Sequence, residues 1–339
     1  PPGLASNDYR KALRQVREKG IAPELLGTLA PNDKPRTEDE TVVGIYWGYD
    51  GALELGTPPR LYNAIIRDVA TKIPNPKFGN QINKVAQNAR LFALVNAAMA
   101  DAAILAWEQK YVHDFWRPVL GIREHGPSLG PEDAPDSAIG KDADTGWLPL
   151  GAPNTNRLTK NFTPPFPAYP SGHATFGAAA FHIARLFYGR PAGDRKRDDL
   201  FKNLSFVSEE LNGVNTDNKG AVRPRHVRDF DDGLWTMIVE NGLSRVYLGV
   251  HWIFDAFAAG NNEKPDLAQG VDLANGIAGI GGVPLGLAIA EDIFANGMEA
   301  ADGAAPGAAM QALSVAEAMS PEVVVNLSAV APALPWPLG

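Results

Sequence analysis

Three short segments, far apart in the chain, carry side chains that could bind a small anion. In the first, KYVHDFWRP, Lys110 and Arg117 are seven residues apart. Seven residues make nearly two helical turns, so both cations are predicted to project from one face at the end of a single helix, which Pro118 would end near Arg117. A solvated helix face is the commoner reading of two such cations. Here, however, aromatic residues flank them, and buried cations need partners.

The second segment, YPSGHATF, directly precedes a run of helix-forming residues. Ser171 could simply cap that helix, which is the more frequent role of a serine at this place. The unpaired N–H groups of a helix N-terminus also bind anions. Gly172 would let the backbone approach a ligand closely, and His173 can titrate near neutrality.

The third segment, SRVYLGVH, holds Arg245 and His251. On an unbroken helix these side chains would point roughly 120° apart. For both to reach one centre the helix must break between them, and Gly249 is the natural place. Three cations, donors at a helix start and two imidazoles, without the acidic cage that a hard divalent cation needs, predict a pocket for a compact tetrahedral oxyanion.

The composition excludes several classes of protein. The chain has 339 residues, of which 45% are hydrophobic and 21% charged, as in globular proteins with a sizeable core. A net charge of -8 argues against nucleic acid as a partner, and the absence of cysteine excludes disulfides, thiolate metal sites and cysteine nucleophiles. Asn96 and Asp101 interrupt the most apolar stretch, residues 91–107, so no membrane span is predicted.

Helical periodicity dominates wherever a pattern is clear, and it predicts an all-α helical bundle. Long Pro-, Gly- and Asp-rich connections over residues 124–170, 212–228 and 260–285 are expected to be irregular loops that form walls or lids. The predicted helices cover residues 6–19, 60–73, 86–113, 172–188, 197–211, 229–248, 252–259 and 287–296.

The three segments also match a known signature in the correct order. Lys-x6-Arg-Pro at 110–118, Pro-Ser-Gly-His at 170–173 and Ser-Arg-x5-His at 244–251 resemble the type 2 phosphatidic acid phosphatase and vanadium haloperoxidase superfamily. The stretches TVVGIYWGYDG, GTPPRLYN, PPFPAYPSGHATFG, SEELNGVN and GGVPLG are similar to the fungal vanadium chloroperoxidases, from about residue 41 to 296. The resemblance implies the helical-bundle fold of this superfamily.

The resemblance also implies a domain organisation. Chloroperoxidases of this kind carry an additional helical bundle ahead of the catalytic one. Residues 1–40 are therefore expected to be a helical remnant of that bundle or a link to it, residues 41–300 the catalytic bundle, and residues 301–339 an Ala/Pro-rich tail. We expect either a homodimer or association with the missing N-terminal bundle. The first residues contain no signal peptide, as in a mature exported chain, and a secreted or periplasmic location is expected.

The chemistry that the resemblance implies is oxidation of chloride or bromide by hydrogen peroxide to hypohalous acid, which then halogenates an organic acceptor. Vanadate would occupy the oxyanion pocket, where phosphate could take its place. His251 would bind the vanadium, and His173 would act as acid and base on the opposite side. Lys110 would polarise the bound peroxide, so its removal is expected to reduce turnover more than stability. The implied ligands of the vanadate oxygens are Lys110, Arg117, Ser171, Gly172 and Arg245.

Three more residues gain an expected role from the resemblance. Phe166 and Trp107 would border the halide, and Asp50 would pair with Arg245. From the residues alone, both aromatics could equally be core side chains and Asp50 a turn residue. An apolar wall weakens the hydration of a halide, so both chloride and bromide are expected substrates.

Two other functions fit the same residues. In an acid phosphatase, His251 would attack phosphorus and His173 would protonate the leaving alcohol. Phe166 and Trp107 favour the haloperoxidase over this alternative. A noncatalytic anion-binding helical protein is the third hypothesis, and the presence of both motif histidines argues against it, because holding an anion does not require them.

Overall fold

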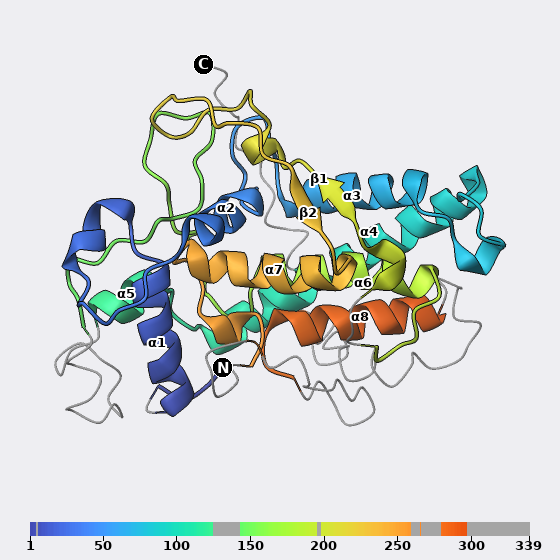
Figure 1. The fold of residues 1–339 in the computed structure, drawn as a ribbon. Coiled ribbons are helices and arrows are strands. Elements are labelled where there is room, and N and C mark those ends of the chain that lie inside the picture. Colours follow the sequence, from blue (N-terminus) through green and yellow to red (C-terminus); the bar gives the residue numbers. More distant parts are fainter. Residues whose placement is uncertain (5, 125–142, 195–197, 259–264, 266–278, 297–339) are drawn as a thin grey trace, which may run out of the picture.

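A computed structural model describes residues 1–4, 6–124, 143–194, 198–258, 265 and 279–296 of the chain. One buried helix, α6 (Gly172–Phe187), lies at the centre of a helical bundle (Figure 1). Every residue of α6 is buried, which suits the largely apolar stretch GAAAFHIARLF. Its two polar side chains have partners: His182 lies 2.9 Å from Glu291, and Arg185 donates to Asp198 at 2.8 Å. The all-α helical bundle predicted from periodicity is confirmed.

Four long helices pack around α6. One of them, α8, runs beside α6 for most of its length (Figure 1). The buried faces of these helices carry the apolar side chains that the sequence spaces at helical intervals, such as Leu61, Ile65 and Val69 in α3. The central set consists of α3 (Pro58–Lys72), α4 (Val85–His113), α7 (Leu234–Tyr247) and α8 (Gly282–Asn296).

Shorter elements complete the fold. Strands β1 (Leu204–Phe206) and β2 (Arg228–Phe230) form a small antiparallel sheet in which Ser205 lies opposite Asp229. The other described elements are α1 (Asn7–Lys19), α2 (Glu38–Tyr46), α5 (Pro118–Arg123) and the short 3-10 helices η1 (Pro23–Thr28), η2 (Pro76–Phe78), η4 (Asp199–Phe201), η5 (Glu209–Leu211) and η6 (Ile253–Asp255).

Helix α1 packs against α5, α7 and η6, all of which belong to the predicted catalytic bundle. Its first turn is capped by Ser6, and Tyr9 on its buried face lies 5.2 Å from Trp252, centroid to centroid. Trp116 donates a hydrogen bond of 3.0 Å to the Tyr9 hydroxyl. The boundary near residue 40 stays a prediction, and the predicted tail at 301–339 lies outside the described residues.

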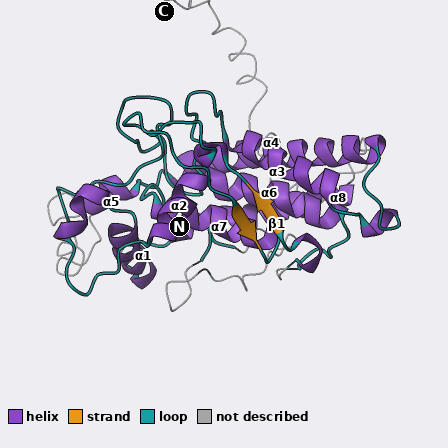
Figure 2. Ribbon diagram, turned by 45° about the horizontal axis from the view of Figure 1, so that its top comes forward, coloured by secondary structure: helices purple, strands orange, loops and turns teal. Residues whose placement is uncertain are grey.

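Irregular connections gather over one end of the helices (Figure 2). Asn156 ties three of them together, because its amide donates 3.0 Å hydrogen bonds to the Leu53 carbonyl and to Asn215. Residues 143–170 and 212–227 are irregular, as predicted, whereas residue 228 belongs to β2. Most of the third predicted connection, 260–285, lies outside the described residues, and α8 begins at Gly282 instead of residue 287.

Several predicted helix bounds were wrong because tertiary contacts decide them. The described part of 197–211 contains β1 and two 3-10 turns instead of a helix, since residues 204–206 pair with 228–230. Because of the same pairing, the helix predicted at 229–248 begins only at Leu234, directly after Gly233, which has a φ of 75°. At 252–259 only the 3-10 turn η6 is helical within the described residues.

Two helices were missed. The start of α2 is a capping box, in which the Thr37 hydroxyl accepts from the Glu40 N–H and the Glu40 carboxylate accepts from the Thr37 N–H. Helix α5 starts at Pro118, which sequence analysis treated only as the end of a helix. A proline occupies the first turn of a helix without losing a backbone bond.

One segment of the described chain, Val85–Arg123, is long and apolar enough to cross a membrane by length and composition alone. Of its most apolar window, 39% is buried in the structure, and α4 packs against α6 and α8. Core helices pass the same test, so this is weak support for a span. The absence of a membrane span stays a prediction.

Candidate functional site

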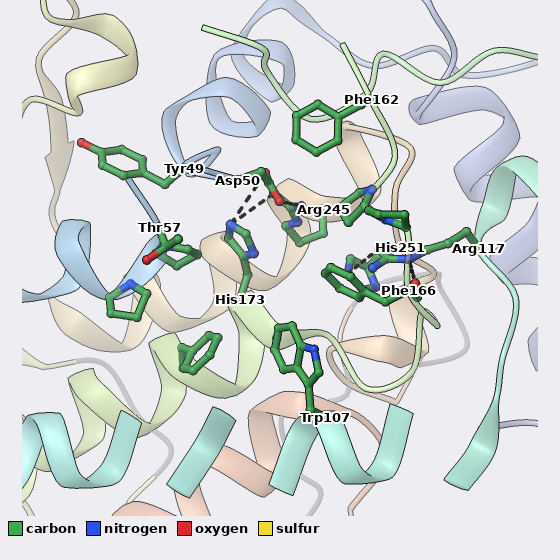
Figure 3. A pocket seen from close by; sticks show the side chains of 16 residues that line it. Tyr49, Asp50, Thr57, Trp107, Arg117, Phe162, Phe166, His173, Arg245 and His251 are labelled. Carbon is green, nitrogen blue, oxygen red and sulfur yellow. Dashed lines mark hydrogen bonds and ion pairs between the residues drawn. The ribbon is translucent and has the colours of Figure 1, made fainter. Parts of the chain in front are cut away.

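The three predicted segments meet at one cavity of about 350 Å³ at the N-terminal end of α6. Figure 3 shows His173, Asp50 and Arg245 on one side of it and His251 with Arg117 on the other. Proline and aromatic side chains form the remaining walls. The cavity is lined by Tyr49, Asp50, Thr57, Pro58, Pro59, Trp107, Arg117, Phe162, Pro164, Pro165, Phe166, Gly172, His173, Phe176, Arg245 and His251.

Lys110 and Arg117 lie on different elements, and of the two only Arg117 lines the cavity. Helix α4 ends at His113, where Asp114 adopts a left-handed φ of 42°, and Arg117 is the N-cap of α5. The prediction of one helix carrying both cations was therefore wrong. Pro118 begins α5 instead of ending α4, and the chain turns between the two helices.

Arg117 is 4% exposed and lies against the third segment. Its Nε donates to the Phe166 carbonyl at 2.8 Å, and its Nη1 donates to the Val250 carbonyl at 2.8 Å. The same Nη1 lies 2.9 Å from His251 Nε2. Its Nη2 is buried and has no hydrogen-bond partner among the described residues. A buried guanidinium N–H without a partner is costly, so this atom points to an absent acceptor.

The ammonium group of Lys110 is fully buried and donates to backbone carbonyls of the loop that leads into α6. The acceptors are Pro167 at 3.0 Å, Ala168 at 2.9 Å and Pro170 at 2.6 Å. Burial, and then the charge of Arg117, hold the pKa of Lys110 well below its usual value. An ammonium has three protons, so Lys110 serves this loop in the structure and could reach an anion only by releasing a carbonyl.

The predicted cap at Ser171 is present, since its hydroxyl accepts from the Ala174 N–H at 3.4 Å and α6 starts at Gly172. A Cβ added at Gly172 would lie 3.0 Å from the Trp107 ring, which leaves little room for any larger residue. The N-terminus of α6 and its positive dipole end thus lie at the cavity.

The expected ion pair between Asp50 and Arg245 is present and bidentate, with N–O distances of 2.7 and 2.9 Å. Burial alone would raise the pKa of Asp50, but Arg245 and then His173 hold it below the usual value. Arg245 is 1% exposed, and its Nε has no partner among the described residues. This is a second buried guanidinium N–H that lacks an acceptor.

His173 Nε2 lies 2.5 Å from the Gly48 carbonyl, which can only accept, so this nitrogen carries a proton. Arg245 Nη1 lies 3.3 Å from the same nitrogen. Burial first, and then Arg245, lower the pKa of His173 to about 4. The ring is therefore neutral near pH 7, and Nδ1 retains its lone pair.

His251 follows a break in the chain at the predicted place. Helix α7 ends at Tyr247, and Gly249 adopts a φ of 70°. A Cβ at Gly249 would lie 2.5 Å from the Gly20 carbonyl oxygen, so both the conformation and the close packing require glycine. The prediction of a break at Gly249 is confirmed.

Asp255 orients His251 and was missed by sequence analysis. His251 Nδ1 lies 2.7 Å from Asp255 Oδ2, so Nδ1 carries the proton and the Nε2 lone pair faces Arg117. Burial, and then Arg117 and Lys110, hold the pKa of His251 well below its usual value. A neutral imidazole oriented by a carboxylate is a good ligand or nucleophile. The available signal was a carboxylate four residues after His251, in HWIFD.

The two predicted halide-side aromatics are neighbours. The rings of Trp107 and Phe166 are 5.1 Å apart, and the Arg117 guanidinium lies 4.9 Å from the Phe166 centroid. The Lys110 ammonium lies 5.3 Å from the same ring. An apolar wall therefore stands directly beside buried positive charge, which suits a weakly hydrated anion.

The donors of the site suit an oxyanion better than a cation. Within the described ranges, no group of three or more His, Asp or Glu side chains could hold a metal ion. Arg117 Nη2 and Arg245 Nε are buried donors in need of acceptors, and the first turn of α6 adds backbone N–H groups. A tetrahedral oxyanion would supply the missing acceptors. The residues therefore fit vanadate or phosphate.

The chain is similar in sequence to a known enzyme. A vanadium chloroperoxidase of Curvularia inaequalis is 40% identical to this chain over 347 aligned positions. The match covers 88% of this chain and 54% of the relative, so the chain spans about half the length of that protein.

Solved structures show the same fold. A bacterial vanadium-dependent iodoperoxidase matches with a TM-score of 0.50 and 19% identity, over 88% of this chain and 51% of that one. Residues 90–263, just over half of the chain, match the family described as the VCPO second helical-bundle domain. The chain belongs to this family of vanadium chloroperoxidase helical-bundle domains.

Proposed function

We propose that this chain is a vanadium-dependent haloperoxidase that uses hydrogen peroxide to oxidise chloride and bromide to hypohalous acid. The proposal is carried by a neutral His251, whose Nε2 lone pair faces Arg117, together with two buried guanidinium N–H groups, Arg117 Nη2 and Arg245 Nε, that have no acceptor among the described residues. The 40% identity to a vanadium chloroperoxidase supports it. The proposed partners are hydrogen peroxide, a halide and an organic acceptor, and the proposed location is secreted or periplasmic.

Vanadate is the proposed cofactor. When bound, it would supply a pentavalent metal that acts as a Lewis acid on hydrogen peroxide. His251 Nε2 would be the vanadium ligand, because Asp255 keeps the ring proton on Nδ1, and the Nε2 lone pair would exchange its 2.9 Å contact with Arg117 Nη1 for the metal. Arg117 and Arg245 would hold oxygens through their unpartnered N–H groups, and the N-terminus of α6 at Ser171 and Gly172 would add further donors. Lys110 would exchange one of its carbonyl partners for an oxygen.

His173 has the features of a proton carrier. Formation of hypohalous acid from peroxide and halide consumes one proton for each water released. His173 Nε2 keeps its proton in the bond to Gly48, so Nδ1 is the atom that can take up and deliver a proton. Its low pKa without an anion means that nearby negative charge would raise its basicity toward the working range.

Phe166 and Trp107 would exclude water where the halide reacts. Removing water from chloride costs free energy, and the buried charge of Arg117 beside the dry aromatic wall would offset part of that cost. We therefore propose that chloride as well as bromide is a substrate.

The test is an assay of the vanadate-loaded chain. We expect vanadate-dependent halogenation of monochlorodimedone with peroxide and either halide, and inhibition by phosphate, which competes for the same donors. His251→Ala should abolish this activity, because His173, the other histidine that lines the cavity, keeps a proton on Nε2 in its bond to the Gly48 carbonyl and cannot replace it. His226→Ala, outside the cavity lining, is the control and should retain it.

The same preparation without vanadate should be assayed for p-nitrophenyl phosphate hydrolysis. Phosphatase activity that depends on His251, with no halogenation at any vanadate concentration, would replace the proposal with the acid phosphatase alternative. Tight vanadate binding without either activity would indicate an anion-binding protein.

A further inference from the structure

One peptide group connects His173 to a buried carboxylate that the proposed mechanism does not use. The Gly48 carbonyl accepts from His173 Nε2 at 2.5 Å, and the N–H of the same peptide unit, on Tyr49, donates to Glu210 Oε1 at 3.2 Å. The C=O and N–H of a trans peptide point in opposite directions. The imidazole, the peptide and the carboxylate therefore form one continuous chain of hydrogen bonds.

The turn that carries this peptide has an unfavourable conformation. Tyr49 adopts a φ of 52°, which is uncommon and unfavourable for a residue with a side chain. Its hydroxyl accepts from the Glu209 N–H at 2.9 Å, and its own N–H is held by Glu210. A Cβ at Gly48 would lie 2.8 Å from Glu210 Oε1, so the carboxylate packs directly against the turn.

Glu210 is itself held in place. It is fully buried, and its Oε2 accepts from the Thr155 hydroxyl and from Arg223 Nη1, the latter at 3.0 Å. All of these side-chain and backbone partners can donate, which matches a carboxylate and would not suit an amide in the same place.

We propose that Glu210 is a positioning residue, which acts through the Gly48–Tyr49 peptide to fix the orientation and the Nε2–H tautomer of His173. Hydrogen bonds in a chain polarise one another, so a carboxylate at one end makes the Gly48 carbonyl a stronger acceptor at the other. The carboxylate of Asp255 orients His251 by a direct hydrogen bond. The carboxylate of Glu210 serves His173 in the same way, but through one intervening peptide group. The catalytic consequence rests on the proposed function, whereas the tautomer does not.

The turn also carries Asp50, the partner of Arg245. Loosening Tyr49 therefore disturbs a second group of the site. Since both groups serve the bound anion and the proton transfer, and not the apolar halide wall, we expect kcat to fall while the KM for halide is retained.

The first measurement is the tautomer of His173 by NMR of the full chain labelled with ¹⁵N-histidine. The chain has six histidines, and His173→Asn identifies the signal by its loss. At pH 8, above the pKa of about 7 to which burial raises Glu210, wild-type His173 should carry its proton on Nε2. In Glu210→Ala this preference should be lost. The nearly isosteric Glu210→Gln should give an intermediate result and serves if the alanine variant does not fold.

The second measurement is halogenation by the same vanadate-loaded variants. We expect about a tenfold lower kcat for Glu210→Ala, with the halide KM changed by less than about twofold, as for other residues that orient a catalytic imidazole. Thr155→Val is the matched control. It removes a hydrogen bond from the same buried carboxylate on the side away from Tyr49, and it should keep both the tautomer and kcat.

Two results would overturn the proposal. One is a His173 proton on Nε2 in wild type and in both Glu210 variants. The other is that Thr155→Val loses the Nε2–H preference and kcat as much as Glu210→Ala does, which would show that Glu210 has only a structural role. Absence of halogenation in wild type would refute the proposed function, while the NMR measurement would still decide the positioning role.

Discussion

Lys110 shows how one side chain can serve both the fold and the chemistry of a site. Its ammonium donates to the carbonyls of Pro167, Ala168 and Pro170, directly ahead of the Ser171 cap. These residues hold the entry to α6 and the Phe166 side of the cavity. The sequence motif identifies the cation but not these partners. The structure therefore adds a structural role to the expected catalytic one.

We predict that Lys110→Ala loses stability as well as turnover. Three carbonyls, two of them in fully buried hydrogen bonds, would lose their donor, which should lower the free energy of unfolding by about 2–4 kcal/mol. Urea denaturation and the halogenation assay measure the two effects on one sample. Lys72→Ala, which removes an exposed ion pair on α3, should change stability by less than about 1 kcal/mol. Full stability in Lys110→Ala would show that the loop does not depend on it.

At the scale of elements, the ends of helices place the reactive groups. Arg117 caps α5, His173 lies in the first turn of α6, and His251 follows the break after α7. Helix ends leave backbone donors and acceptors without partners and let the chain change direction. Both properties are needed to direct cations and imidazoles at one point from helices that pack side by side.

The break after α7 gives a prediction of its own. Gly249→Ala would force a side chain into a φ of 70° and within 2.5 Å of the Gly20 carbonyl oxygen. The expected cost is about 3 kcal/mol of unfolding free energy, together with weaker vanadate binding because His251 moves. Thermal denaturation and vanadate titration test it. Gly27→Ala is the control, since no atom lies within 4 Å of the added carbon. If Gly249→Ala is destabilised but binds vanadate with unchanged affinity, the position of His251 does not depend on the break.

At the scale of the whole molecule, folding buries an unusual concentration of ionisable groups. His173 and His251 are held neutral, while Glu210 and Asp255 are shifted in the other direction, each to a pKa of about 7, by burial. Such shifts cost stability in the free protein. The negative charge of a bound oxyanion would relieve the lowered pKa values of the two histidines, but not the raised pKa values of the two carboxyl groups. The homodimer or the association with a further bundle stays a prediction, which sedimentation can test.

The low pKa of His173 makes stability depend on pH with a defined sign. An unfolded histidine takes up a proton near pH 6.5, whereas folded His173 does so only near pH 4, so the unfolded state gains as the pH falls between these values. Between pH 7 and 5, wild type should lose about 2 kcal/mol more stability than His173→Gln. Glu210 and Asp255 act in the opposite direction, but equally in both proteins. Equal pH profiles in urea denaturation would contradict the shift.

Much of the fold was visible in the sequence because helical periodicity and caps are local properties. The long helices α1, α3, α4 and α6 and the break at Gly249 follow from apolar spacing, Ser171 and glycine. Strands β1 and β2 could not be predicted, since each has only three residues and depends on a partner far along the chain. At 197–211 the local sequence favours a helix, but the pairing of β1 with β2 determines the structure of this segment instead.

The sequence by itself determined which groups could bind an oxyanion, because residue type fixes charge, donors and tautomeric capacity. It could not determine which donors would be left free for a ligand. Only the tertiary structure commits Lys110 to loop carbonyls, leaves Arg117 Nη2 and Arg245 Nε without acceptors in the described part of the chain, and places a carboxylate behind His173 and behind His251. The physical reason is that hydrogen bonds and desolvation depend on distances between residues that are remote in sequence, and these distances exist only after the helices have packed.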